Sequence, residues 1–442
     1  MQNALVPKEE QPYKIPSNWC WSYWKYCGKF IAGNGFKNIY QGFTQYDIPY
    51  YKVGSLKFCD EGNYLIDETN TINEEIRTKL KAVKIPVNSI IFAKIGEAIK
   101  LNRRCLNKIE CCIDNNLMAF ISEKYFYKYI FYWTKSLNFY ELTNATTVPA
   151  LRKTDLENIP IPLPPLNEQQ RIVNRIESLF VKLDRAKELI ENTLAQFEQN
   201  KMAILHKAFT GELTAKWRKE NNIDLSSWQE KTIDELCTSL KYGTSKKSKL
   251  EGSVVVLRMG NLQNGEIDWS NLMYTDDKDD IEKYLLKKGD VLFNRTNSPE
   301  LVGKTSIYRG EYPAIYAGYL IKLDYGKDII GEYLNYMMNS TKAKHYCYTV
   351  KTDGVSQSNI NAKKIGAFEI PVPTIEEQQE IVNILDKLLA KYNKIKNLEQ
   401  QLEKIELLKK AILAKAFRGE LGTNNPDEES AENLLKEILA EK

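Results

Sequence analysis

The sequence contains very little histidine, and this scarcity excludes several kinds of chemistry. Only His206 and His345 occur among 442 residues, and no two of the eight cysteines form a C-x-x-C pair. The ligand spacing of a zinc site is therefore missing, and we expect the cysteines to be reduced structural residues. No serine or cysteine stands in a pattern with a histidine base, so nucleophilic catalysis has no support. We expect no metal site and no catalytic residue in this chain.

Glycine-rich phosphate loops are missing as well. Residues 301–306 (LVGKTS) resemble the end of a phosphate-binding loop, but that loop needs a glycine at position 298, where a serine stands. Residues 30–35 (FIAGNG) lack the spacing of a dinucleotide or adenosylmethionine loop. The acidic run at 275–280 (TDDKDD) is more typical of a solvated loop than of a metal site. The sequence thus indicates no cofactor for this chain.

Long apolar runs do not occur either. No stretch reaches roughly eighteen apolar residues, and residues 1–14 lack the apolar centre of a signal peptide. These absences predict a cytoplasmic protein with no membrane partner. The net charge of +4, from 62 basic and 58 acidic residues, does not by itself indicate a nucleic-acid partner. Its distribution is more informative, because residues 241–249 (KYGTSKKSK) hold four lysines and no acid.

An internal repeat is the most informative feature that is present. Residues 160–174 (PIPLPPLNEQQRIVN) return as residues 369–383 (EIPVPTIEEQQEIVN), a shift of 209 positions. Residues 203–213 (AILHKAFTGEL) return as residues 411–421 (AILAKAFRGEL), a shift of 208. Twice this shift covers nearly the whole chain, so the sequence is a duplication of a two-part unit. Each copy of this unit consists of a variable segment followed by a shorter, closely repeated segment.

The shorter segments carry apolar residues at heptad spacing and are expected to be long helices that stop at Gly211 and Gly419. Each helix carries a narrow apolar seam that must be buried against a partner. The two matching helices can bury their seams against each other, which predicts an antiparallel coiled coil. The alternative is a pair of core helices in a larger bundle. The seam residues are Ile172, Ile176, Leu179, Leu183, Ala186, Ile190, Thr193 and Phe197 in the first copy, and Leu385, Leu388, Tyr392, Ile395, Leu398, Leu402, Ile405, Leu408 and Ile412 in the second.

The variable segments each contain β-rich stretches bounded by turn residues and one Tyr-rich stretch that is expected to be helical. The β-rich stretches are residues 46–58, 85–95, 254–262 and 285–295, and the Tyr-rich ones are residues 125–140 and 331–346. The predicted fold class is α/β (mixed α+β), with two similar domains separated by two long helices in a pseudo-two-fold duplication. The predicted domains are residues 1–160, a helical region at 161–220, residues 221–370, and a helical region at 371–442.

The order PLPPLNEQQRIV and AFTGELTAKWR, then PVPTIEEQQEIV and AFRGEL, resembles the specificity (S) subunit of type I restriction–modification systems. The resemblance covers essentially the whole chain, and the tail at 426–442 resembles the short amphipathic helix that ends many members. It implies two target recognition domains, each of which binds one half of a split double-stranded DNA sequence, with the coiled coil setting the gap.

The resemblance also implies that the chain itself is non-catalytic. It would be one subunit of a type I site-specific deoxyribonuclease and adenine-DNA methyltransferase complex that defends against phage. Two methyltransferase (M) subunits and, through them, restriction (R) translocase subunits are the implied partners. S-adenosylmethionine, ATP and Mg are expected on those partner subunits.

DNA recognition requires basic side chains for the phosphates and hydrogen-bonding side chains for the base edges. The candidate phosphate contacts are Lys94, Lys100, Arg103 and Arg104 in the first domain and Lys241, Lys246, Lys247 and Lys249 in the second. The candidate base readers are Arg258, Asn294, Arg295 and Asn297. Each of these is also compatible with an ordinary surface side chain.

The repeated blocks are the implied docking surface for the M subunits. The candidate partner-binding residues are Glu168, Gln169, Gln170, Phe209, Glu212, Leu213 and Trp217 in one copy and Glu377, Gln378, Gln379, Phe417, Glu420 and Leu421 in the other. Some of them are expected to cap helices or pack the joint instead. Residues 214–221 (TAKWRKEN) have no counterpart after Leu421, so the two docking surfaces are expected to differ.

Two alternatives stay open at this point. A standalone regulator with two unlike DNA-binding domains would bind DNA tightly without a partner. A scaffold that uses the coiled coil to space two protein-binding domains would ignore DNA. The sequence distinguishes only weakly between a type I specificity subunit and the specificity subunit of a related multi-subunit modification enzyme.

Overall fold

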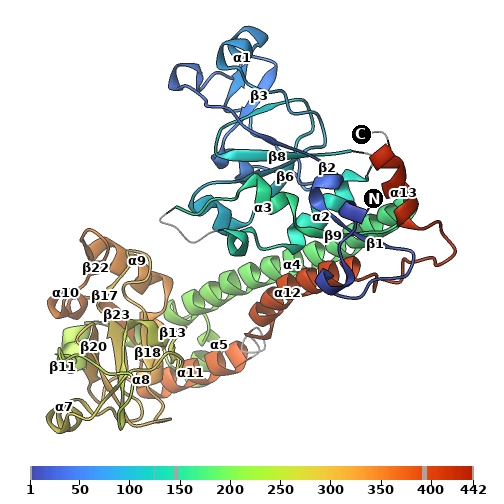
Figure 1. Ribbon diagram of the computed structural model, residues 1–442. Coiled ribbons are helices and arrows are strands. Elements are labelled where there is room, and N and C mark those ends of the chain that lie inside the picture. The colour runs from blue at the N-terminus through green and yellow to red at the C-terminus, as the bar shows by residue number, and fades with distance from the viewer. Residues whose placement is uncertain (1, 124, 144–147, 391–395, 441–442) are drawn as a thin grey trace. The chain divides into compact units, whose positions relative to one another are not determined.

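The computed structural model describes residues 2–123, 125–143, 148–390 and 396–440. The chain divides into two compact units (Figure 1), and each is built from segments far apart in sequence. Unit 1 consists of Met1–Leu189 and Gln401–Lys442, and unit 2 consists of Ile190–Gln400. The sequence repeat predicted boundaries that follow the chain, whereas each unit combines a variable segment with helices from both repeated segments.

Unit 1 contains a four-stranded sheet in the order β2-β8-β5-β6, a three-stranded sheet in the order β4-β3-β7, and the antiparallel pair β1-β9. The strands of unit 1 are β1 (Cys20–Tyr23), β2 (Gly28–Ala32), β3 (Ile48–Tyr51), β4 (Thr71–Ile72), β5 (Ile90–Ala93), β6 (Arg104–Leu106), β7 (Cys112–Ile113), β8 (Leu117–Ser122) and β9 (Pro160–Leu163). Its α-helices before the coiled coil are α1 (Glu74–Leu80), α2 (Tyr127–Ser136) and α3 (Lys153–Glu157).

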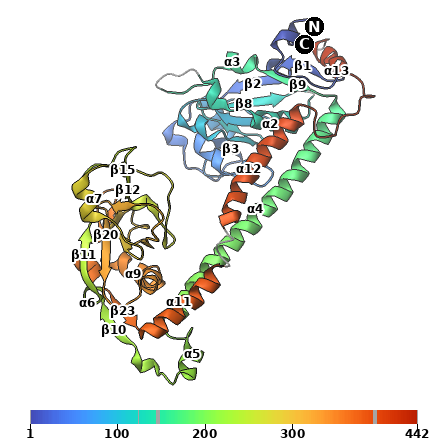
Figure 2. The ribbon, with the colours of Figure 1, turned by 90° about the horizontal axis from the view of Figure 1, so that it is seen from below.

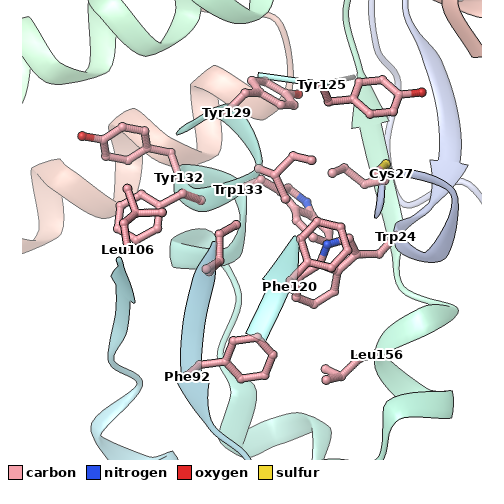
Figure 3. Close-up of a cluster of buried hydrophobic side chains, with 14 of the residues drawn as sticks. Trp24, Cys27, Phe92, Leu106, Phe120, Tyr125, Tyr129, Tyr132, Trp133 and Leu156 are labelled. Carbon is pink, nitrogen blue, oxygen red and sulfur yellow. The ribbon is translucent and has the colours of Figure 1, made fainter. Parts of the chain in front are cut away.

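Aromatic side chains from strands and helix α2 fill the core of unit 1 (Figure 3). Trp24 is fully buried, and its ring lies 5.0 Å from the rings of both Phe120 and Trp133. Such rings bury a large apolar area and prefer edge-to-face contacts. The Tyr-rich stretch at 125–140 therefore forms a core helix, as its composition predicted.

Unit 2 repeats the strand order of these three sheets and adds the small sheets β13-β14 and β17-β22-β21. Its four-stranded sheet has the order β11-β20-β16-β18, its three-stranded sheet the order β15-β12-β19, and β10 pairs with β23. The strands are β10 (Gln229–Thr232), β11 (Cys237–Tyr242), β12 (Val254–Leu257), β13 (Leu262–Gln263), β14 (Glu266–Ile267), β15 (Tyr274–Thr275), β16 (Val291–Asn294), β17 (Thr296–Asn297), β18 (Thr305–Ile307), β19 (Ala314–Tyr316), β20 (Leu320–Tyr325), β21 (Thr352–Asp353), β22 (Ser358–Asn359) and β23 (Glu369–Val372). The α-helices are α5 (Ala215–Glu220), α6 (Ile233–Leu236), α7 (Lys278–Tyr284), α8 (Gly331–Met338), α9 (Thr341–Val350) and α10 (Ala362–Gly366).

In both units the three-stranded sheet contains one parallel strand pair, β3-β7 in unit 1 and β12-β19 in unit 2. The strand order and the pairing directions of these sheets agree between the units. The predicted duplication and the mixed α/β class are therefore confirmed.

The long helices follow the predicted heptad seam. Helix α4 (Leu166–Phe209) has 44 residues, and its seam residues Ile172 and Ile176 are fully buried. In unit 1, helix α12 (Lys396–Phe417) lies alongside α4 (Figure 2). Asp184 pairs with Lys409, and Lys187 lies 3.8 Å from Glu406. The residue number rises along α4 while that of its partner on α12 falls, so these two helices run antiparallel, as predicted.

The second repeated segment is described as two helices, α11 (Ile375–Ala390) and α12. In unit 2, Leu205 and Phe209 of α4 share a core with Ile381 and Leu385 of α11. The predicted seam residues Tyr392 and Ile395 lie outside the described residues.

Both predicted glycine stops and the predicted tail helix are confirmed. Gly211 and Gly419 have φ angles of 79° and 74°, the left-handed conformation that glycine adopts after a helix. Helix α13 (Ala431–Ala440) buries Leu435 and Ile438 in the core of unit 1. No helix in the part of the chain that the structure describes is long and apolar enough to cross a membrane.

The seam makes a direct prediction for the stability of unit 1. Ile176 is fully buried, whereas Val181 on the same helix is 67% exposed. We expect Ile176→Ala to lower the free energy of unfolding by about 2–5 kcal/mol, because it leaves a cavity. The matched variant Val181→Ala is expected to change it by less than about 0.5 kcal/mol. Urea unfolding of the full chain, followed by tryptophan fluorescence, measures both, and equal losses would contradict the predicted seam.

Candidate nucleic-acid and partner interfaces

The repeated Glu-Gln-Gln motif lies where α4 and α11 begin, and its first two side chains are fully buried. In unit 1 the indole Nε1 of Trp19 donates to Glu168 Oε2 at 2.9 Å. In unit 2 the indole Nε1 of Trp228 donates to Glu377 Oε2, also at 2.9 Å. We call each tryptophan–glutamate pair the glutamate joint of its unit. Each joint ties the start of a variable segment to the helix that follows it.

The glutamine that follows each joint glutamate makes the same two bonds in both units. Gln169 donates from Nε2 to the carbonyl of Pro164 at 3.0 Å and accepts at Oε1 from the amide of Phe126 at 3.1 Å. Gln378 donates from Nε2 to the carbonyl of Pro373 at 2.9 Å and accepts at Oε1 from Ile330 at 2.9 Å.

These accepting bonds satisfy the backbone amides just before α2 and α8. The amide side chains therefore lock the Tyr-rich helix of each unit to its long helix.

The two joints differ in how the buried carboxylate is neutralised. In unit 2, Arg218 Nη1 lies 2.6 Å from Glu377 Oε1, and the hydroxyl of Thr214 also donates to that oxygen at 2.6 Å. In unit 1, the amide of Asn424 donates to Glu168 Oε2 at 2.9 Å, and no described ion pair involves Glu168. Burial raises the pKa of Glu168 above the ordinary glutamate value, and the bonds from Trp19 and Asn424 offset part of that effect.

The phenylalanine of each Ala-Phe block also packs inside its unit. The ring of Phe417 lies 5.4 Å from that of Tyr129 in unit 1, and the ring of Phe209 lies 5.4 Å from that of Tyr333 in unit 2. Both tyrosine hydroxyls donate to a proline carbonyl of the strand that comes before a long helix, Tyr129 to Pro162 in β9 and Tyr333 to Pro371 in β23. Each phenylalanine therefore packs in the core of its own unit.

The candidate partner-binding residues thus divide by exposure. Six side chains are buried and offer no surface to a partner: Glu168, Gln169, Phe209, Glu377, Gln378 and Phe417. Three are half-buried, Leu213, Trp217 and Leu421, and four are exposed, Gln170, Glu212, Gln379 and Glu420. Sequence reasoning overlooked Arg218 beside Trp217, and the one signal for it was that the TAKWR segment has no counterpart after Leu421.

The candidate phosphate contacts are mostly on the surface. Lys100, Arg103, Lys241, Lys246, Lys247 and Lys249 are exposed, and Lys94 is half-buried. Lys241 pairs with Asp324 at 3.1 Å, and Lys246 pairs with Asp277 at 2.6 Å. The lysine run is therefore partly neutralised by acids of the same unit, a fact that its sequence did not reveal.

Arg104 and Asn294 are the two DNA candidates that the structure buries. Arg104 is 3% exposed, its Nη2 donates to the carbonyl of Leu137 at 2.8 Å, and its guanidinium lies 3.7 Å from the ring of Phe139. Burial lowers its pKa to about 9. Asn294 is fully buried in β16, where its amide donates to the carbonyl of Met259 at 3.4 Å. Neither side chain presents a surface to DNA.

Arg295 lies at the end of β16 in a fixed orientation. Its guanidinium stacks 4.7 Å from the ring of Tyr242, Nη2 donates to Asn359 Oδ1 at 3.1 Å, and Nη1 donates to the carbonyl of Gly318 at 3.4 Å. Arg258 is held in a similar way, because its Nη2 donates to the carbonyl of Asn271 at 2.7 Å. Both side chains are half-buried, and so is Asn297, whose Oδ1 accepts from the amide of Ser298.

Among the described residues, no group of three or more histidine, cysteine, aspartate or glutamate side chains could hold a metal ion. The arrangement therefore provides oriented hydrogen-bond donors and a basic surface. These features suit recognition of a ligand.

Comparison with known proteins agrees with this chemistry. The family described as type I restriction modification DNA specificity domain matches residues 38–198 and again residues 226–407. The chain is 29% identical over 315 residues to the specificity subunit of the type I restriction enzyme EcoKI of Escherichia coli, covering 68% of each chain. It is 29% identical over 335 residues to the StySPI specificity subunit of Salmonella potsdam, covering 71% of each.

A chain from a solved structure of a type I restriction–modification system shares the fold. The TM-score is 0.67 at 19% identity, and the match covers 92% of this chain and 100% of the other.

The unequal glutamate joints give a test with a built-in control. We expect Glu377→Gln to lower the free energy of unfolding by about 3 kcal/mol or more, because it leaves Arg218 buried without a counter-charge. We expect Glu168→Gln to cost less than about 1 kcal/mol at pH 7, since a neutral amide still accepts from Trp19.

The pH dependence of Glu168→Gln follows from the raised pKa of Glu168. A carboxyl whose pKa is higher in the folded state destabilises the fold above that pKa, and this cost vanishes below the ordinary glutamate pKa of about 4.3. The free energy of unfolding of Glu168→Gln should therefore increase relative to that of the wild type as the pH rises from 4 to 7. Urea unfolding across this range measures both variants, and equal losses for the two at pH 7 would contradict the described asymmetry.

Proposed function

Because the chain belongs to the type I restriction modification DNA specificity family, we propose that it is the sequence-recognising subunit of a type I restriction–modification complex. Each unit binds one half of a split double-stranded DNA target. The chain acts as a non-catalytic subunit, and its relatives from the EcoKI and StySPI enzymes are named as specificity subunits. A standalone regulator and a protein-binding scaffold lose support, since neither is suggested by these relatives.

The observation that carries this proposal is the contrast between what the two units share and what they do not. They share strand order, glutamate joints and the locking glutamines. They differ at polar side chains on strand ends, where unit 2 places Arg258 and Arg295. A common scaffold with unlike polar side chains is suited to two unlike base sequences.

The exposed basic side chains supply the part of the affinity that does not depend on sequence. In unit 2 these are Lys241, Lys246, Lys247 and Lys249, and in unit 1 they are Lys100 and Arg103. Arg104 and Asn294 are left out because they are buried. Lys241 and Lys246 would exchange their acidic partners for phosphates, which makes their contribution smaller than that of Lys247.

The exposed ends of the repeated blocks are the proposed docking surface for two methyltransferase (M) subunits. It comprises Gln170, Glu212, Leu213, Trp217, Gln379, Glu420 and Leu421. The restriction (R) subunits join through the M subunits, and S-adenosylmethionine, ATP and Mg bind on those partners. Helix α4 belongs to both units, so its length is proposed to set the gap between the half-sites.

The direct test is to co-express the full chain with its neighbouring candidate M subunit and to map methylated adenines across the genome. We expect one split motif with a constant gap between its halves. An M subunit that is active with another S chain but gives no new methylation with this one would exclude the proposal. DNA binding without methylation would then favour the standalone regulator.

The role of the lysine run is tested by its salt dependence. We expect Lys247→Ala to reduce the slope of log affinity against log salt by about 0.9, because one phosphate contact is lost. Lys404→Ala is the control, since Lys404 is an exposed lysine of helix α12 far from either variable segment in sequence. Titration of the assembled complex with its target duplex measures both, and identical slopes would remove Lys247 from the interface.

A further inference from the structure

The two units keep the same backbone hydrogen bonds around the turn that links their larger sheets. In unit 2, Ala317 N donates to Leu257 O at 2.9 Å, and Arg295 N donates to Tyr319 O at 3.0 Å. Ile360 N then donates to Arg295 O at 2.9 Å.

Unit 1 repeats these three bonds with other residues. Asp114 N donates to Tyr51 O at 2.9 Å, Lys94 N donates to Asn116 O at 2.9 Å, and Leu151 N donates to Lys94 O at 2.8 Å. The matching bonds establish which positions correspond, although the variable segments share little sequence.

By this correspondence Lys94 occupies the position of Arg295, and Lys52 occupies the position of Arg258. Lys52 directly follows Tyr51, and Arg258 directly follows Leu257. Each begins a short 3-10 helix, and each backbone amide donates to the side chain three residues ahead, at 3.0 Å for Lys52 and 2.9 Å for Arg258. Both units therefore place two basic residues beside the same turn.

The neighbours of Arg295 in unit 2 and of Lys94 in unit 1 also correspond. Tyr242 and Ala32 each end the outer strand of the four-stranded sheet and precede a glycine, Gly243 or Gly33. A Cβ at either glycine would lie within 2.1 Å of a backbone carbonyl oxygen of the turn, so the close approach is built into both units.

On the other side, the position beside Arg295 in unit 2 is Asn359, and the corresponding position beside Lys94 in unit 1 is Ala150. Asn359 bridges to Thr296, and Ala150 bridges to Ile95. Arg295 is thus clamped between a tyrosine ring and an asparagine amide, whereas the two corresponding positions in unit 1 are Ala32 and Ala150, which carry neither group.

The side chains themselves indicate a base contact for unit 2. Oxygens of the same unit hold both guanidinium groups in place, since Nη2 of Arg258 donates to the carbonyl of Asn271 and Nη2 of Arg295 donates to Asn359 Oδ1. A phosphate contact needs charge and little orientation, but a base edge needs donors held in a plane. An oriented arginine donates to both O6 and N7 of guanine, while a lysine donates from a single rotatable group.

We propose that the basic pair beside this turn, Arg258 and Arg295 in unit 2 and Lys52 and Lys94 in unit 1, is the base-reading element of each unit. This inference rests on the proposed function. The clamped arginines select guanine in one half-site. Each lysine offers a single rotatable amine, which in Lys52 donates to Gln41 Oε1 at 2.7 Å, and the lysines make the other half-site unlike it. Lys52 thereby gains a role equivalent to that of Arg258.

The test selects bound duplexes from a library of random double-stranded DNA with the full chain assembled with its M subunit. We expect Arg295→Lys and Arg258→Lys each to reduce the preference for guanine at one position of one half-site about tenfold or more. We expect Lys52→Gln and Lys94→Gln to change only the other half-site. Lys247→Ala is the control and should weaken binding without changing the motif.

The outcomes separate this inference from the function beneath it. A wild-type complex that enriches no motif overturns the proposed function, and the inference falls with it. A clear wild-type motif that the four variants leave unchanged, or change alike in both halves, overturns the inference alone. Unchanged binding of the variants to a non-specific duplex at low salt shows that they remain folded and assembled.

Discussion

Each unit depends on a carboxylate that is buried at the start of a long helix and bonded to a tryptophan from the start of the variable segment. A buried charge is costly unless it is hydrogen-bonded, so these two glutamates force the surrounding segments into one arrangement. Glu168 and Glu377 are both fully buried, yet they are satisfied by different groups. Unit 2 supplies the guanidinium of Arg218, and the donors to Glu168 among the described residues of unit 1 are neutral groups such as Asn424.

The joints explain why several residues of the repeated blocks are buried. Glu168 and Gln169, with their counterparts Glu377 and Gln378, attach helices to strands within each unit. What remains free to vary is the surface that the scaffold presents at its strand ends. This division of labour allows two unlike recognition surfaces on one architecture, and it accounts for the likeness of the chain to specificity subunits.

Much of the architecture was predictable because it is written in local periodicity and in the repeat. The heptad seam located α4, the glycines located its end and that of α12, and the Tyr-rich stretches located α2 and α8. The burial of Glu168 was not predictable in the same way. A polar triplet near a helix start is usually solvated, and only long-range bonds to Trp19 and Asn424 reverse that expectation.

The candidate site was predicted less completely. Residue type alone suggested Arg104 as a phosphate contact, but its stacking on Phe139 depends on a helix that lies far along the chain. The correspondence of Lys52 with Arg258 was invisible in the sequence, since it rests on backbone bonds between distant strands. The repeat predicted two like domains, and three-dimensional hydrogen bonding was needed to align them residue by residue.

The central claim is that each variable segment reads one half-site independently of the other. The most direct measurement replaces the segment from β1 to β9, Cys20–Leu163, by the corresponding segment of a relative and maps the methylated adenines of the assembled complex. The account predicts a hybrid motif in which one half is new and the other half is that of the wild type. A motif in which both halves change, or neither does, would contradict it.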